Sequence, residues 1–336
     1  MKKLLFLPIL LIFALTACGS SEEAVEYPIY ELADYNEPQE YEPEEINDEA
    51  QDRPNIHGLL SYVEYGGNRA YIFGSMHLGR PYFFPLADEV EQALRRADVF
   101  AFEFDLTELQ DLAGLLEMAS YMMLPLGTTL ADVLPEETHA HLLNVLETFP
   151  LVNYEEIAMF RPMVASTMIT AMEIFPMMDI SPEYSVDTYI MSVAQELGRQ
   201  IIGLNPLAHE MYLLHSAPME VQIAAIQDLT DRDTMIEIAA DLGLVEAYTS
   251  QDMDALLALL RPYGLEPNAF AEYMIDVILI QRSIEFAEGI HRLLTETTEP
   301  TVFFVTMGIG HMIGNDHGNV FIVLEDMGHN ITPLWK

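Results

Sequence analysis

Two apolar runs, far apart in the chain, constrain the fold more than any other feature of the sequence. "RAYIF" ends at Phe73 and "TVFFVTM" ends at Met307, and each places apolar residues on consecutive positions. A strand with one face in water would alternate apolar and polar residues, so runs of this kind are typical of strands covered on both faces. The sequence therefore predicts central, buried strands with helices on both sides of the sheet.

The same short unit, Gly-x-x-His, follows each run. It reads "GSMH" from Gly74 to His77 and "GIGH" from Gly308 to His311. In α/β sheets the polar functional groups project from the carboxyl ends of the strands, and a glycine there permits a tight turn or the close approach of another group to the backbone. One such unit is often an ordinary surface histidine. Two in matching contexts favour a shared site, and we expect the two imidazoles to meet in one cleft.

A carboxylate in a third predicted strand strengthens this interpretation. Glu103 lies in "FAFEFDL", between Phe102 and Phe104. A carboxylate in a buried strand is costly unless it is paired with a cation or coordinates a metal ion. Two imidazoles and one carboxylate are a ligand set for a catalytic divalent metal, and equally a set for metal-free acid–base chemistry. The residues alone leave both open, along with an internal ion pair between the carboxylate and an arginine.

Three other polar residues are candidates for the same site. Ile278, Arg282 and Phe286 fall on one strip of the helix predicted for "VILIQRSIEFAEGI", so the guanidinium should point inward, toward the buried glutamate or an oxyanion. Asp187 opens the predicted helix "DTYIMSVAQEL" and is either its N-cap or a functional residue. His317 follows the second unit in "GNDHGN", where a solvated histidine is the simpler expectation.

The segments around these residues predict an α/β order. "LLSYVEY" and "RAYIF" flank a glycine turn and should form a hairpin, "LADEVEQALRRA" has helical spacing, and "DVFAFEFDL" is predicted to be a strand. From about 106 to 260 the pattern is helical apart from one strand, "RQIIGLN". A long helix then begins near Asn268, the helix "NVFIVLEDMG" ends at Gly328, and "NITPLW" is predicted as a closing strand.

The fold class that follows is α/β, with a central, mostly buried β-sheet flanked by helices and a large helical insertion (about 106–260) acting as a cap. The methionine-rich stretch "MVASTMITAMEIFPMM" within the insertion is interrupted by Glu173 and Pro176. Methionine is a common filler of irregular cores, so we expect a buried helix here rather than a membrane span.

The N-terminal residues predict export. Residues 1–18, "MKKLLFLPILLIFALTAC", join two lysines to an apolar core too short to cross a bilayer. "LTAC" followed by "GS" is similar to a bacterial lipobox, which predicts a lipidated Cys18 and a lipoprotein on the extracytoplasmic side of a bacterial membrane; the alternative is an ordinary buried cysteine. Residues 19–55 are acidic and poor in apolar clusters, which is typical of a disordered tether. The globular domain should span residues 56–336.

Composition narrows the possible partners. The chain carries a formal charge of −40, with only 14 lysines and arginines. Nucleic acids and anionic membrane surfaces are recognised by clustered basic residues, so we expect neither as a direct partner. Cys18 is the only cysteine, so the globular domain has no disulfide and depends on its core.

Taken in order, the motifs resemble one family. "GSMH", "FAFEFD", "YSVDTYIMSVAQELGRQIIGL", "LIQRSIEFAEGIHRLL" and "VTMGIGHMIGNDHGNVFIVLEDMGHNIT" are similar in order and spacing to the TraB/GumN/PrgY family, over nearly everything after about Gly58. That family is related to the Tiki metalloproteases and distantly to erythromycin-esterase-like and ChaN-like proteins. The resemblance implies an α/β core and a metal-dependent hydrolytic site at His77, His311 and Glu103. We therefore expect a lipid-anchored hydrolase that cleaves a peptide or related amide bond in a peptide or protein substrate, with Arg282 stabilising the oxyanion.

Two departures from the family pattern leave other functions open. Asn205 stands where the family usually has glutamate, and Ser283 stands where it usually has asparagine. Both changes remove a polar group that would support the site. The alternatives are a binding protein that sequesters a peptide signal or a metal ion without turnover, and a metal-free esterase that uses histidine and glutamate alone.

Overall fold

The computed structural model describes residues 54–105, 112–250, 252–260, 268–314 and 318–335. The predicted signal segment with Cys18, almost all of the predicted tether and His317 lie outside these ranges. Within them, no helix combines the length and the apolar character needed to cross a membrane.

One mixed sheet forms the framework of the fold, with the strand order β4-β3-β5-β2-β1-β6. The strands are β1 Ser61–Tyr65, β2 Asn68–Ser75, β3 Val99–Phe104, β4 Gln200–Asn205, β5 Val302–Gly308 and β6 Thr332–Pro333. β1 and β2 form the predicted antiparallel hairpin, while β2, β5, β3 and β4 run parallel. β6 pairs with β1 over two residues, which makes it shorter than the predicted closing strand.

The last long strand in the sequence occupies the middle of the sheet. β5 lies between β2 and β3, with Gly74 opposite Met307 on one side and Ala101 opposite Val305 on the other. Every residue of β5 from Phe303 onward is buried, as predicted for a strand covered on both faces. Because β2 and β5 are parallel and in register, the two Gly-x-x-His units leave the sheet at the same edge.

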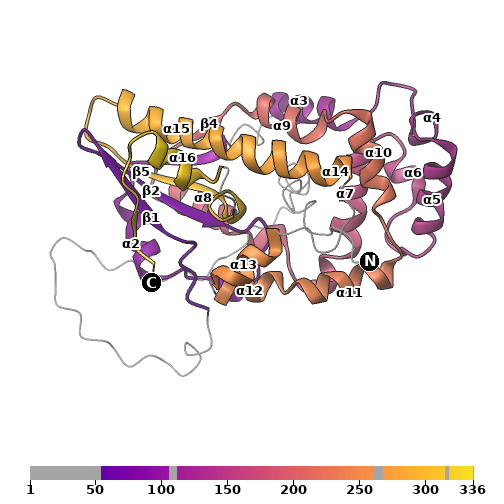
Figure 1. The fold of residues 1–336 in the computed structure, drawn as a ribbon, viewed down its shortest axis with the longest axis horizontal. Coiled ribbons are helices and arrows are strands. Elements are labelled where there is room, and N and C mark those ends of the chain that lie inside the picture. Colours follow the sequence, from indigo (N-terminus) through magenta and orange to yellow (C-terminus); the bar gives the residue numbers. More distant parts are fainter. Residues whose placement is uncertain (1–53, 106–111, 251, 261–267, 315–317, 336) are drawn as a thin grey trace.

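Helices cover the sheet, and a larger group of helices lies to one side of it (Figure 1). The helices packed on the sheet include α2 Asp88–Arg96, α8 Val186–Glu196 and α15 Arg282–Glu296, and α16 Val320–Asp326 packs on α15. Between β3 and α8 the chain forms α3 Leu112–Met122, α4 Leu130–Val133, α5 Glu136–Leu146, α6 Tyr154–Ile157 and α7 Pro162–Glu173. After β4 it forms α9 Leu207–His215, α10 Met219–Gln227, α11 Arg232–Leu242, α12 Leu244–Ser250, α13 Met253–Leu260 and α14 Ala269–Tyr273.

The helical part has a core of its own. Leu142 of α5, Ile157 of α6 and Ile169 of α7 belong to a buried cluster separate from the core around the sheet. The methionine-rich stretch forms α7, most of which is buried, as predicted. The segment 106–260 also contributes to the part of the protein around the sheet, because it contains α8 and β4.

The long helix predicted after Asn268 is present but irregular. α14 continues into a π-helical segment, Met274–Gln281, and then into α15. The predicted inward strip is confirmed, since Ile278, Arg282 and Phe286 are all buried. Such π-helical turns are frequent at functional sites, and this one ends immediately before the arginine.

Candidate functional site

The structure brings the two motif histidines and the buried glutamate together. His77 lies in the loop after β2, His311 ends the short 3-10 helix that follows β5, and Glu103 lies in β3. The Nε2 atoms of His77 and His311 are each 3.9 Å from Glu103 Oε1. Three side chains from distant parts of the sequence thus face one point, because β5 lies between β2 and β3 in the sheet.

Each imidazole is held through its Nδ1 atom. His77 Nδ1 lies 3.0 Å from Asp187 Oδ2, and His311 Nδ1 lies 2.9 Å from Ser283 Oγ. The Ser283 hydroxyl donates to the carbonyl of Leu279, at 2.6 Å, so it accepts from His311 Nδ1–H. Both Nδ1 atoms therefore carry a proton, and both Nε2 atoms are directed to the shared point. Among the described residues, His311 Nε2 has no hydrogen-bond partner.

Asp187 is not the cap of its helix. The N-cap of α8 is Ser185, whose side chain accepts from the backbone N–H of Thr188. Asp187 is buried and accepts hydrogen bonds from Ser75 Oγ, at 2.7 Å, and from His77. The N-cap interpretation is therefore wrong, and the carboxylate fixes the orientation of the first motif histidine.

The motif glycines permit close packing rather than an unusual backbone. A Cβ on Gly308 would lie 3.1 Å from His77 Nε2 and 3.5 Å from Glu103 Oε1, and its N–H donates to that carboxylate at 2.8 Å. A Cβ on Gly74 would lie 2.8 Å from the side chain of Ile309. Of the two reasons given for a glycine at these positions, close approach of another group is the one that applies.

Arg282 lies on the opposite side of Glu103 and joins it to a second carboxylate. Arg282 Nη2 is 2.5 Å from Glu103 Oε2 and 2.6 Å from Glu210 Oε2. Glu210, in α9, was not singled out from the sequence. A signal was present, because Leu207, Glu210 and Met211 share the buried strip of α9, and a glutamate on such a strip requires a partner.

The two departures from the family pattern still contribute polar groups. Ser283 supplies the hydroxyl that fixes His311, and Asn205 Nδ2 donates to Glu210 Oε1 at 2.7 Å. Neither position is therefore left without a role in the hydrogen-bond network of the site.

Charges and burial set the protonation states. Burial alone would raise the pKa of Glu103, but Arg282, the two imidazoles and the Gly308 N–H lower it to about 2. Burial lowers the pKa of His311 to about 3, with help from Arg282 and against the attraction of Glu103. Burial also acts to lower the pKa of His77, yet Asp187 and Glu103 outweigh it and raise that pKa. At neutral pH the site thus holds an ionised carboxylate and a neutral His311.

The donor atoms suit a divalent cation, although their spacing is wide. Ligand atoms of one tetrahedral ion, at about 2.1 Å from it, lie about 3.4 Å apart, compared with 3.9 Å from each Nε2 atom to Glu103 Oε1. In the described ranges, no three His, Cys, Asp or Glu side chains are arranged to hold a metal ion as they stand. Histidines held through Nδ1, with Nε2 free for coordination, are nevertheless the usual arrangement around metals.

The buried charge of the site is negative. Asp187, Glu103 and Glu210 are carboxylates and Arg282 is the cation among them, and all four are at most 8% exposed. When all four are ionised and the imidazoles are neutral, the cluster carries a formal charge of −2. Uncompensated buried charge is costly, so the cluster favours the entry of a cation.

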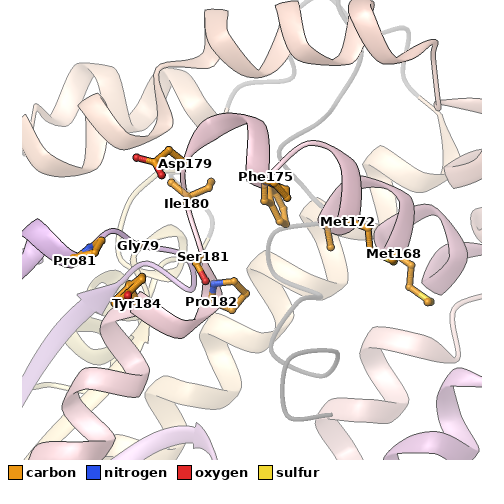
Figure 2. Close-up of a pocket in the computed structure, with 12 residues that line it drawn as sticks. Gly79, Pro81, Met168, Met172, Phe175, Asp179, Ile180, Ser181, Pro182 and Tyr184 are labelled. Atoms are coloured by element: carbon orange, nitrogen blue, oxygen red, sulfur yellow. The ribbon is translucent and has the colours of Figure 1, made fainter. Parts of the chain in front are cut away.

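A pocket of about 630 Å³ opens beside the loop that carries His77. Its walls are largely apolar; Figure 2 shows Met168, Met172 and Phe175 toward the right and Gly79, Pro81, Ile180, Pro182 and Tyr184 toward the left. Gly79 and Ser181 exchange two backbone hydrogen bonds of 3.0 Å, which tie the His77 loop to the segment leading into α8. The pocket lies within two residues of His77, or about 7 Å along the chain.

The comparisons with known proteins agree with the motif order. No curated protein and no solved structure matches this chain with significance. The family model described as TraB/PrgY/gumN matches residues 59–333, which include His77, Glu103, Arg282 and His311. The chain therefore belongs to the TraB/PrgY/gumN family.

Proposed function

We propose that this protein is an exported, lipid-anchored hydrolase that cleaves a peptide or related amide bond and uses a divalent metal ion held by His77, His311 and Glu103. The observation that carries the proposal is the convergence of two Nδ1-anchored imidazoles on one ionised carboxylate oxygen. A bound divalent ion brings the pKa of water from about 15.7 toward 7 and polarises a carbonyl group. The presence of three buried carboxylates beside one arginine supports the same cation.

The protein's own side chains have separate parts in this proposal. Asp187 and Ser283 hold the two imidazoles through Nδ1, so that both Nε2 atoms are directed to the shared point. Glu103, with a pKa of about 2, is a poor base and is better suited to holding a cation than to accepting the proton of water. Arg282 Nη1 is buried without a hydrogen-bond partner among the described residues, so it is available to an oxyanion.

The pocket beside the His77 loop suits an apolar side chain of the substrate. An extended peptide advances about 3.3–3.6 Å per residue, so a residue two or three positions from the cleaved bond would reach the pocket. The site itself is closed, since His77 is 6% and Glu103 is 8% exposed and His311 is fully buried. Substrate entry therefore requires a segment over the site to move.

Metal content and peptide cleavage test this function together. We expect the purified protein to hold about one divalent metal per chain and to cleave internally quenched peptides of mixed sequence, with loss of cleavage on chelation and recovery on adding the metal. The double variant His77→Ala, His311→Ala should hold no metal. The matched control is His291→Ala, His329→Ala, which removes another histidine pair, with Nδ1 and Nε2 2.9 Å apart, outside the site. Full cleavage by the first double variant would sink the proposal.

One observation favours metal-free ester hydrolysis as a second candidate. The pairing of Asp187 with His77 Nδ1 also suits a general base, in which Nε2 would take a proton from water. Cleavage of esters that survives complete metal removal would select this candidate. Depletion of a peptide with no fragments by mass spectrometry would instead select a binding protein.

A further inference from the structure

We propose that Glu210 is a positioning residue, whose carboxylate on α9 holds Arg282 against Glu103. The inference rests on the proposed function for its consequence in catalysis, but the arrangement that it describes can be tested without any reaction.

The contacts of Glu210 are specific and fully buried. Its Oε2 accepts from Arg282 Nε at 2.7 Å and lies 2.6 Å from Arg282 Nη2, while its Oε1 accepts from Asn205 Nδ2 at 2.7 Å. The carboxylate is thus fixed by a guanidinium on one oxygen and by an amide on the other. Glu210 is 0% exposed, so water does not replace any of these partners.

Arg282 depends on this carboxylate for its orientation. Its Nη2 lies 2.5 Å from Glu103 Oε2 and 2.6 Å from Glu210 Oε2, whereas its Nε donates to Glu210. A neutral residue at position 210 would leave the guanidinium with one ionised partner, Glu103, and it would rotate toward that partner. Glu103 Oε1, which faces both imidazoles, would move with it.

Asn205 and Glu210 form a complementary pair. Asn205 ends β4 beside the end of β3, where Phe104 is its register partner. A carboxylate at both positions would place two negative charges within hydrogen-bond distance, which is unfavourable in a buried site. One carboxylate and one amide satisfy each other, so the pair should tolerate an exchange in which glutamate occupies position 205 and glutamine occupies position 210.

The experiment follows the Arg282 Nε–H group by proton–nitrogen NMR in the intact chain. The signal is assigned by its absence from Arg282→Lys. In the wild type it should exchange slowly with water, because it is buried and donates to Glu210. We expect Glu210→Gln to speed this exchange at least about tenfold, and we expect Asn205→Glu combined with Glu210→Gln to restore slow exchange.

A matched control and the contrary outcomes complete the test. Glu285→Gln removes the same charge from a residue whose Oε2 lies 3.4 Å from Asn205 Nδ2, and it should leave the Arg282 signal unchanged. Slow exchange in Glu210→Gln, or fast exchange in the folded double variant, overturns the proposal. If Glu210→Gln does not fold, the double variant decides alone: a folded protein with a protected Nε–H supports the proposal, and a failure to fold overturns it.

Activity separates this proposal from the proposed function. Against quenched peptides, Glu210→Gln should lower kcat by about 100-fold with little change in KM, since a misplacement of about 1 Å costs that much, and the double variant should recover most of it. A wild-type protein that cleaves nothing refutes the proposed function and leaves the NMR result standing. Normal kcat in a Glu210→Gln variant with altered Arg282 exchange refutes the positioning role.

Discussion

At the scale of single residues, a partner residue fixes the orientation of each imidazole and of the arginine in the site. Asp187 orients His77, Ser283 orients His311, and Glu210 holds Arg282. The residues that face the shared point all lie at strand ends or on a predicted inward strip, so the sequence predicted them. Their partners come from α8, α9 and α15, and their contacts depend on how helices pack on the sheet, which local patterns do not encode.

Another buried histidine, outside the site, gives a prediction about how stability depends on pH. His215 is 1% exposed, neither of its ring nitrogens has a partner among the described residues, and burial, with Arg161, lowers its pKa to about 3. The folded protein therefore cannot take up the proton that the unfolded chain binds below about pH 6.5. This group's contribution to stability is complete above that pH and is lost as the pH falls toward 3, by about 1.4 kcal/mol per pH unit.

We expect His215→Leu to remove that loss. At neutral pH the free energy of unfolding should be unchanged or higher, because an unpaired polar group is replaced by an apolar one. At about pH 5 the variant should be more stable than the wild type by about a further 2 kcal/mol. Urea unfolding at the two pH values measures both quantities, and a stability difference that is the same at both would contradict the prediction.

At the scale of elements, the strands were predictable and their exact neighbours were less so. Apolar runs predicted β2, β3 and β5, and the glycine turn predicted the β1–β2 hairpin. The single helix between β2 and β3 favours a right-handed crossover that brings the two strands near each other, but the insertion of β5 between them follows from pairing between distant segments. The π-helical turn before Arg282 had no signal in the residue pattern either.

The pocket formed with α7 gives a prediction about substrate preference. Met172 lines the pocket and is 41% exposed, so Met172→Glu places a carboxylate in an apolar site without disturbing the core. We compare two peptides that differ only at the residue expected to enter the pocket, leucine in one and alanine in the other. For the leucine peptide we expect KM to rise about tenfold with kcat nearly unchanged, and for the alanine peptide we expect little change in either constant.

Steady-state kinetics on the two peptides provides the measurement. Met159→Glu is the control, because Met159 is 52% exposed and does not line the pocket. An equal change for both peptides in Met172→Glu, or the same change in the control, would argue against the pocket as a substrate site.

At the scale of the whole molecule, the remaining proposal concerns where the protein works. We expect Cys18→Ser to release the protein from the membrane fraction or to leave it unprocessed, because the acyl chains would be the attachment. One chain binds only marginally, so firm attachment requires several, and the acidic residues after Cys18 would repel anionic lipid. Fractionation with an N-terminal mass measurement tests this. Normal processing together with unchanged membrane retention would refute the anchor.

The central position of β5 determines which part of the chain completes the proposed site. Residues 302–308 come after β1 to β4 in the chain, yet they supply the strand between β2 and β3 and lead into the short helix that carries His311. Without these residues, no strand joins β2 to β3. Glu103 then has neither the N–H of Gly308 nor His311 beside it. A chain that stops before β5 therefore cannot assemble the proposed site, whatever else of the fold it forms.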